Sequence, residues 1–267
     1  MKLPLVVLVF VLVFVASNLS HCVFDCTLVG CCSRAGAQEA KNETARITAI
    51  EPASIVSGTK TTLKVRGFKL KESTEIRFPM VTEVKGEITE KKDSGPPKGL
   101  ENKLVGDTQL LADITLPANH PAGILEYVIS TPAGDAAGKL RVLAVETSID
   151  EIEPNDGFRE AQKLQPNQFA RGAIQGDKDV DVYAFPAKAG QQLKVTVTSG
   201  GLLIMDAVLQ CYDARGQFLA AADDGESRDP VLMLKSPTDG SVYLCISSAH
   251  DIGGEWNSYL LTVEEVN

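Results

Sequence analysis

The sequence predicts an all-β protein in which two β-sandwich domains follow an N-terminal signal segment. A hydrophobic content of 44% and a charged content of 23% are typical of a folded chain, and 267 residues leave room for two domains of ordinary size. Short segments in which apolar and polar residues alternate recur through both halves of the chain and are separated by Gly, Pro, Asn and Asp residues. This alternation is typical of strands that are buried on one face.

Residues 1–37 have the pattern of an export signal. Lys2 precedes an apolar run, Leu3 to Ala16, which is too short for a comfortable membrane span of about 20 residues. Small residues at Val15-Ala16-Ser17 offer an ordinary cleavage site. Leu28-Val29-Gly30-Cys31 resembles a bacterial lipobox, in which Cys31 would be acylated. We expect export to the periplasm, the cell surface or the medium, by cleavage or by lipidation, and a polar tail at residues 38–45.

Residues 46–145 predict the first sandwich. Leu63 and Val65 alternate with Thr62, Lys64 and Arg66, as in a strand with one face toward solvent. Seven candidate strands are Arg46 to Ile50, Thr61 to Arg66, Glu75 to Phe78, Glu83 to Ile88, Gln109 to Leu116, Ile124 to Ser130 and Lys139 to Val145. Such a count over about a hundred residues suggests an immunoglobulin-like fold. The stretch from Lys85 to Lys103 is expected to be largely an exposed loop.

Several motifs of this first domain resemble one family. They are Ile50-Glu51-Pro52, Ser57-Gly58-Thr59, Val65-Arg66-Gly67-Phe68 and Ser130-Thr131-Pro132-Ala133-Gly134. Together they are similar to an IPT/TIG domain. That resemblance implies an immunoglobulin-like spacer of the kind found in cell-surface and enzyme-associated proteins.

Residues 146–267 predict a second sandwich of jelly-roll type. The eight candidate strands are Phe169 to Ile174, Val180 to Phe185, Gln192 to Thr198, Ala207 to Tyr212, Phe218 to Ala221, Val231 to Lys235, Val242 to Ser247 and Ser258 to Val263. Leu193, Val195 and Val197 are expected to face its core. Cys211 and Cys245 both fall in these strands, and an exported protein is free to bridge them only if they share a face of the sheet.

Acidic residues gather at the start of this second domain, in what we call the acidic seam: residues 151–156 and residues 177–181. Residues two apart in an extended chain project from one face, so Glu151 and Glu153 are expected to point together, as are Asp177, Asp179 and Asp181. Grouped carboxylates repel unless a cation compensates them, and Ca²⁺ accepts roughly 6–8 oxygen ligands. The alternative is structural: Asn155 or Asp156 would cap a short helix over residues 158–164, and the other acids would be solvated.

The second domain also resembles a known family over about residues 148–267. The motifs are Glu151-x-Glu-Pro-Asn-Asp, Gly176-Asp177 through Phe185, Ala189-Gly190-Gln191, Asp206-Ala207-Val208-Leu209 and Tyr259-Leu260-Leu261-Thr262-Val263. They are similar to the bacterial pre-peptidase C-terminal domain. In its collagen-binding members a linker and a later Asp-x-Asp hold calcium. The resemblance implies the calcium ligands Glu151, Glu153, Asn155, Asp156, Asp179 and Asp181.

The sequence favours binding over catalysis. His120 and His250 lie in loops of separate domains, and no His-Glu-x-x-His, Gly-x-Ser-x-Gly or phosphate-loop motif is present. A triad assembled across the domains remains an alternative, because triads are defined by geometry. A net charge of −9 argues against nucleic-acid binding, which needs a basic face. Trp256 lies in a polar loop and is the candidate surface ring for ligand recognition, while Tyr183 and Tyr259 are expected in the core.

The expected function is therefore that of an exported, non-catalytic binding or adhesion protein with a calcium-stabilised module. Its partner would be an extracellular polymer or protein. Two alternatives remain open. One is an accessory or chaperone-like partner of a separate secreted peptidase or other hydrolase, and the other is a surface structural protein tethered to the membrane only through a lipid on Cys31.

Overall fold

A computed structural model describes residues 44–201, 203–225 and 227–266. Within these ranges the regular secondary structure is almost entirely β-strand, and the described residues belong to one compact unit. The prediction of an all-β chain with β-sandwich domains is confirmed. The predicted signal segment, the polar tail up to residue 43 and the lipidation candidate Cys31 lie outside the described residues. Among the described residues no helix is long and apolar enough to cross a membrane.

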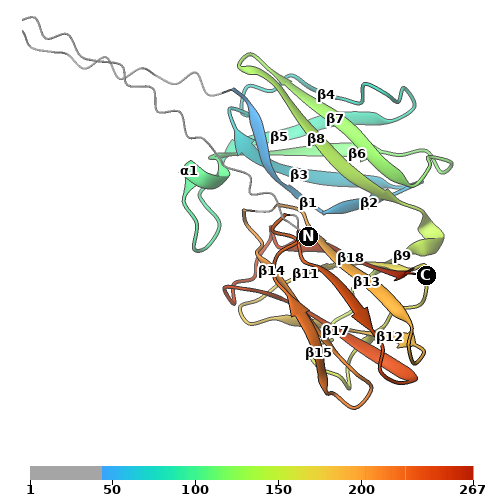
Figure 1. The fold of residues 1–267 in the computed structure, drawn as a ribbon. Coiled ribbons are helices and arrows are strands. Elements are labelled where there is room, and N and C mark those ends of the chain that lie inside the picture. Colours follow the sequence, from blue (N-terminus) through green and yellow to red (C-terminus); the bar gives the residue numbers. More distant parts are fainter. Residues whose placement is uncertain (1–43, 202, 226, 267) are drawn as a thin grey trace, which may run out of the picture. The chain divides into compact units, whose positions relative to one another are not determined.

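The first sandwich has two sheets of four strands (Figure 1). One sheet runs in the order β1-β3-β6-β5 and the other in the order β2-β8-β7-β4. The bounds are β1 Arg46–Glu51, β2 Ser54–Val56, β3 Lys60–Phe68, β4 Glu75–Arg77, β5 Lys85–Asp93, α1 Asn102–Val105, β6 Thr108–Thr115, β7 Gly123–Thr131 and β8 Gly134–Leu143. All seven expected strands are present, and β2, a three-residue edge strand parallel to β8, is an addition.

The core of the first sandwich follows the predicted alternation. Leu63 and Val65 are fully buried between its sheets, together with Leu110, Ile114 and Leu140 from β6 and β8. Burying apolar side chains is worth about 25 cal/mol per Å² removed from water. Because successive strand residues point to opposite faces, Arg66 lies on the other side of β3 from these residues.

Arg66 corrects the expectation that this other side of β3 is solvated. Its side chain is 0% exposed, because the segment between β5 and β6 folds over it. The guanidinium donates hydrogen bonds to Gly95 O at 2.9 Å, Asn102 Oδ1 at 3.0 Å and Gly106 O at 2.7 Å. No carboxylate pairs with it in the described chain. Arg66 therefore holds the segment between β5 and β6 in place by hydrogen bonds to its carbonyl and amide oxygens.

The expected loop from Lys85 to Lys103 is also wrong in its first half. Residues Lys85–Asp93 form β5, which pairs with β6 along its whole length. Most of its side chains are exposed and charged, so the sequence lacks the apolar alternation that marks a half-buried strand. Charged residues are common on such edge strands, where they discourage pairing with another chain.

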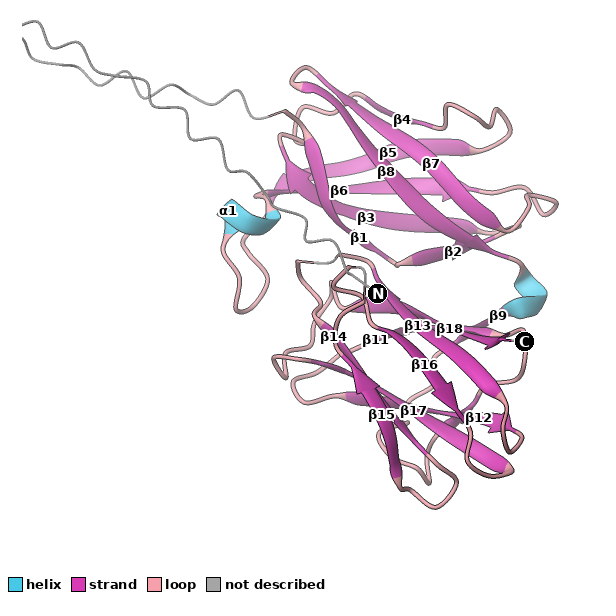
Figure 2. Cartoon of the chain, in the orientation of Figure 1, coloured by secondary structure: helices cyan, strands magenta, loops and turns pink. Residues whose placement is uncertain are grey.

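The second sandwich has two sheets of five strands (Figure 2). Their orders are β10-β12-β17-β14-β15 and β16-β13-β18-β11-β9. A short 3₁₀ helix, Val145–Thr147, precedes the strands β9 Ser148–Asp150, β10 Gln162–Lys163, β11 Phe169–Ala173, β12 Val180–Ala187, β13 Gln192–Ser199, β14 Ala207–Tyr212, β15 Phe218–Ala222, β16 Val231–Lys235, β17 Gly240–Ser248 and β18 Ser258–Val266. The eight expected strands are all present.

The interior of the second sandwich is one apolar cluster. Leu193, Val195 and Val197 of β13 are fully buried in it, as expected. Cys211 and Cys245 are both free. On the paired strands β14 and β17, Cys211 is opposite Leu244 and Cys245 is opposite Gln210, so the two thiols project from opposite faces of the sheet. That geometry prevents a bridge.

Candidate metal centre

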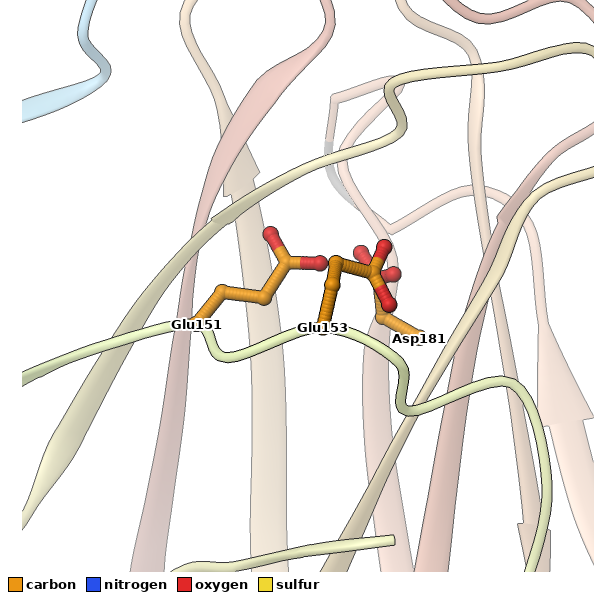
Figure 3. Close-up of side chains that lie close together, drawn as sticks. All are labelled: Glu151, Glu153 and Asp181. Carbon is orange, nitrogen blue, oxygen red and sulfur yellow. The ribbon is translucent and has the colours of Figure 1, made fainter. Parts of the chain in front are cut away.

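Three carboxylates of the acidic seam converge on one point. Glu151, Glu153 and Asp181 each offer an oxygen atom, and these atoms lie within 4.8 Å of one another (Figure 3). Glu151 and Glu153 lie just beyond the end of β9, and Asp181 is the second residue of β12. Asp181 is 0% exposed, Glu151 is half-buried and Glu153 is exposed. The cluster therefore reaches from the interior of the second sandwich to its surface.

The backbone around Glu151 fixes one side of this cluster. Strand β9 pairs in parallel with β11, and the hydrogen bond from Glu151 N to Arg171 O, 2.9 Å, continues that pairing by one residue. The side chain then turns back, so that Glu151 Oε2 accepts a hydrogen bond from Ala173 N at 2.7 Å. Glu151 is thus oriented by two contacts to one neighbouring strand before any ligand is considered.

Asn155 lies on the other side of the carboxylate cluster. It is 0% exposed, and its carbonyl oxygen accepts a hydrogen bond from Val182 N at 3.0 Å, while its own N–H donates to Glu153 Oε2 at 2.9 Å. Its side-chain oxygen faces only other acceptors, Glu153 Oε2 and Asp181 Oδ1, so no group donates to it. Rotating the amide by 180° makes its nitrogen a donor to Glu153 Oε2 at 3.3 Å and to Asp181 Oδ1 at 3.2 Å. Asn155 can therefore serve the cluster with or without an ion.

Asp181 is the most perturbed carboxyl group of the site. Tyr259 donates a 2.5 Å hydrogen bond to its Oδ2, and Tyr183 lies 3.0 Å from the Tyr259 hydroxyl, deep in the core. Burial, with repulsion from Glu151, raises the pKa of Asp181 to about 9, although the Tyr259 hydroxyl opposes the rise. Burial also raises the pKa of Glu151. Without a cation the cluster favours protonation, because buried like charges cannot all stay ionised at low cost.

The chemistry of this donor set suits a hard cation. Carboxylate and amide oxygens bind Ca²⁺ or Mg²⁺, whereas softer metals favour imidazole and thiolate ligands. Four of the six predicted ligands come together here: Glu151, Glu153, Asn155 and Asp181. Their role in binding a metal remains a prediction.

The other two predicted ligands, Asp156 and Asp179, are not among the three carboxylates whose oxygens converge, although the charge of Asp179 helps to raise the pKa of Glu151 and of Asp181. Asp156 is exposed, and Asp179 uses its Oδ2 to accept hydrogen bonds from Gln175 N at 2.6 Å and Gly176 N at 3.3 Å. Asp177, Asp179 and Asp181 do not share a face, because β12 begins only at Val180 and Lys178 has a φ of 65°. The alternative of a helix over residues 158–164 is also wrong, since these residues form turns and the strand β10.

Trp256 requires a correction. The ring was expected on the surface, yet it is 2% exposed. Lys64 Nζ lies 5.5 Å from the ring centroid and Arg66 Cζ 6.0 Å from it, and both belong to strand β3. The loop is polar in composition, but the tryptophan packs beneath these cations. A ring buried in this way does not offer a face to a ligand.

The tyrosine pair beside Asp181 is the part of the site that sequence reasoning missed. Tyr183 and Tyr259 are 0% and 1% exposed, so their expected place in the core is confirmed. Their hydroxyls, however, connect the core to the acidic cluster. A signal for Tyr183 was present in the sequence, because Asp181 and Tyr183 are two apart on one strand and share its inner face.

The histidines form no recognisable catalytic arrangement in the described chain. His120 Nδ1 lies 3.9 Å from a Glu83 oxygen, and His250 Nδ1 lies 3.8 Å from an Asp206 oxygen. No serine or cysteine side chain within the described ranges is hydrogen-bonded to either imidazole. These contacts do not supply the nucleophile and base that a hydrolytic triad requires.

Comparison with known proteins finds a sequence relative for part of the chain. No protein-family model matches the chain. A stretch of 108 residues, 38% of this chain, is 35% identical to a probable subtilase-type serine protease of Deinococcus radiodurans. The match spans only 15% of the length of that protease.

Solved structures resemble this chain only distantly. The pre-peptidase C-terminal domain of a Bacillus anthracis collagenase matches 43% of this chain and 100% of its own length, at 16% identity and a TM-score of 0.32. The secreted serine protease VesC of Vibrio cholerae matches 84% of this chain and 51% of its own, at 8% identity and a TM-score of 0.29. A Bacteroides ovatus glucan-utilisation protein, SGBP-B, covers 82% and 74% at 11% identity and a TM-score of 0.26. Scores this low support no functional argument.

Proposed function

We propose that this chain is an exported, non-catalytic binding protein whose second sandwich is stabilised by calcium at Glu151, Glu153, Asn155 and Asp181. The observation that carries the proposal is the convergence of three carboxylates within 4.8 Å, one of them fully buried. Burying a carboxylate without compensation is costly. A divalent cation would offset that cost and tie the segment after β9 to strand β12.

The exposed end of the cluster fits a calcium ion better than a magnesium ion. Ca²⁺ tolerates irregular coordination by six to eight oxygens, and carboxylates bind it through one or two oxygens. Mg²⁺ demands near-octahedral geometry and keeps several of its waters. Glu153 lies at the surface, which leaves room for water ligands. Together with the protein oxygens, these waters would complete the coordination shell of the ion.

Thermal unfolding of the full chain tests the proposal. We expect the melting temperature to be higher with excess calcium than with a chelator, and magnesium at the same concentration to raise it less. The double variant Glu151→Gln/Glu153→Gln should lose the calcium response. Glu160→Gln, which removes an exposed carboxylate from the same segment, should keep it. Identical melting curves with calcium and with chelator would refute the metal site.

A second candidate function is favoured by the relative in Deinococcus radiodurans. Because 108 residues resemble part of a probable serine protease, the chain could act as the accessory partner of a separate secreted peptidase. Co-purification of such an enzyme with the tagged full chain would support this role. A chain that is recovered alone from its own culture medium would count against it.

A further inference from the structure

Four aromatic rings gather on the outer face of the sheet β10-β12-β17-β14-β15. Tyr243 of β17 is opposite Tyr212 of β14, and Tyr212 is opposite Phe218 of β15, so three rings lie in one row across neighbouring strands. Phe158, from the segment between β9 and β10, stacks on Tyr243 with centroids 4.5 Å apart and planes at 21°. We call Phe158, Tyr212, Phe218 and Tyr243 the aromatic row.

The row does not belong to the core. The neighbouring residues of β14 and β17 that point inward, Cys211 and Leu244, are fully buried in the apolar cluster, and the tyrosines beside them therefore point outward. Phe158 is 40% exposed and Phe218 is 58% exposed. The rings also contact one another, at 5.3 Å between Phe158 and Tyr212 and 5.7 Å between Tyr212 and Phe218. A contiguous exposed aromatic surface of this kind marks an interaction site more often than a lone exposed ring does.

Hydrogen-bonding groups accompany the rings. The Tyr212 hydroxyl donates to Gln210 Oε1 at 3.0 Å, so the amide nitrogen of the exposed Gln210 is directed to solvent or to a ligand. Across the sheet from Tyr243, on the side away from Tyr212, Ala184 of β12 is opposite Tyr243, and Lys163 of β10 is paired with Ala184. The surface thus offers ring faces, hydroxyls, an amide and one ammonium group.

Carboxylates are missing from this row, although the whole protein has a net charge of −9. The nearest acid in the adjoining turn is Asp213, which is 4% exposed and accepts hydrogen bonds from Arg215 N and Gln217 N, both at 2.8 Å. The exposed carboxylates Asp156 and Glu160, each two residues from Phe158, are balanced by the exposed cations Arg159 and Lys163, so this segment carries no net charge for a basic partner to pair with. An acidic polymer would be repelled by the protein as a whole. Charge therefore favours an uncharged partner.

We propose that the aromatic row is a binding platform for a neutral polysaccharide. A sugar ring has a face of C–H groups, which packs against the negative face of an aromatic ring, and a rim of hydroxyls, which tyrosine and glutamine side chains can bind. Rings on adjacent strands, 5.7 Å apart for Tyr212 and Phe218, suit an extended polymer rather than a single sugar. This inference deepens the binding role proposed above and depends on it, but it does not depend on the identity of the ion.

Electrophoresis of the full chain in native gels containing a soluble polymer tests the platform. Hydroxyethylcellulose, amylopectin and galactomannan are the neutral probes, polygalacturonate is the acidic probe and gelatin is the protein probe. We expect retardation by at least one neutral polymer. Phe158→Ala and Phe218→Ala should each weaken the apparent affinity about two- to tenfold, the range expected for one aromatic contact. Tyr212→Phe should weaken it less, because the ring stays and only the hydroxyl is lost.

Met233→Ala is the matched control, since Met233 is 54% exposed but lies on β16 of the other sheet. It should bind as the wild type does. Retardation by no neutral polymer, retardation by gelatin or polygalacturonate alone, or equal affinity of the ring variants and the wild type would overturn the proposal. Melting with calcium, measured on the same samples, separates this outcome from failure of the metal site.

Discussion

Replacing Asp181 by asparagine separates the two roles that its carboxyl has in the structure. In the metal-free protein at pH 7.5 the pKa of about 9 makes this carboxyl neutral. Asparagine is also neutral and of similar shape, and its oxygen can still accept the hydrogen bond from Tyr259. We therefore expect the metal-free variant to melt within about 2 °C of the wild type, as for most substitutions that leave no buried group unpaired.

The calcium response should differ sharply. At one hundred times its dissociation constant, calcium stabilises the wild type by about 2.7 kcal/mol. For a unit of this size that corresponds to a rise in melting temperature of roughly 5–11 °C. Loss of one charged ligand should weaken binding on the order of a hundredfold, which is the interval between classes of calcium site that differ in ligand charge. About 0.4 kcal/mol, or roughly 1 °C, would then remain at the same calcium concentration.

Differential scanning calorimetry with chelator and with calcium measures both effects on one pair of proteins. Glu160→Gln is the control for a lost carboxylate outside the cluster. An Asp181→Asn variant that keeps the full calcium shift would show that the ion does not bind at Asp181. A metal-free variant that melts more than about 5 °C below the wild type would show that the carboxyl is ionised and paired, contrary to its burial.

Three further predictions rest on the titration of Asp181 and on other buried groups. Between the ordinary Asp pKa of 3.8 and the folded value of about 9, folded Asp181 holds a proton that the unfolded chain releases. The metal-free wild type should thus lose up to about 1.4 kcal/mol of stability per pH unit as pH rises from 6 to 9, and urea titrations of Asp181→Asn should show no such slope. Arg66→Met should cost about 2–4 kcal/mol in the same assay and expose the loop between β5 and β6 to trypsin, whereas unchanged cleavage would refute its fastening role. Burial raises the thiol pKa of Cys211 to about 12 and of Cys245 to about 11, so iodoacetamide should label neither before unfolding, and rapid native labelling would contradict their placement.

The positions of the strands were largely predictable from the sequence. Period-2 alternation, as at Leu193, Val195 and Val197, depends only on which face of a strand meets the core, and that information is local. Strands without a buried face lacked this signal. Thus the second half of β5, beyond the expected strand Glu83 to Ile88, was taken for a loop, and the short strands β2, β9 and β10 were not found.

The candidate site was predictable in composition but not in geometry. Glu151, Glu153, Asn155 and Asp181 were selected from sequence motifs, and the fold brings them together. The orientation of Asp179 depends on a turn at Lys178, and the burial of Trp256 depends on Lys64 and Arg66, which are distant in sequence. The aromatic row was not foreseen, because its members come from four separate segments and only strand register aligns them.

One segment joins the two proposed sites. Asn155, which belongs to the acidic cluster, is anchored to β12 through Val182 N, and Phe158 follows it by three residues and lies on Tyr243. An ion that holds Asn155 in place would therefore reduce the motion of Phe158 and lower the entropy lost when a ligand binds that ring. Linkage is reciprocal, so a bound polysaccharide should tighten calcium binding by the same factor. Chelation should weaken polysaccharide retention in the wild type and much less in Phe158→Ala. An equal loss in both proteins would mean that the ion acts on the sandwich as a whole and not through this segment.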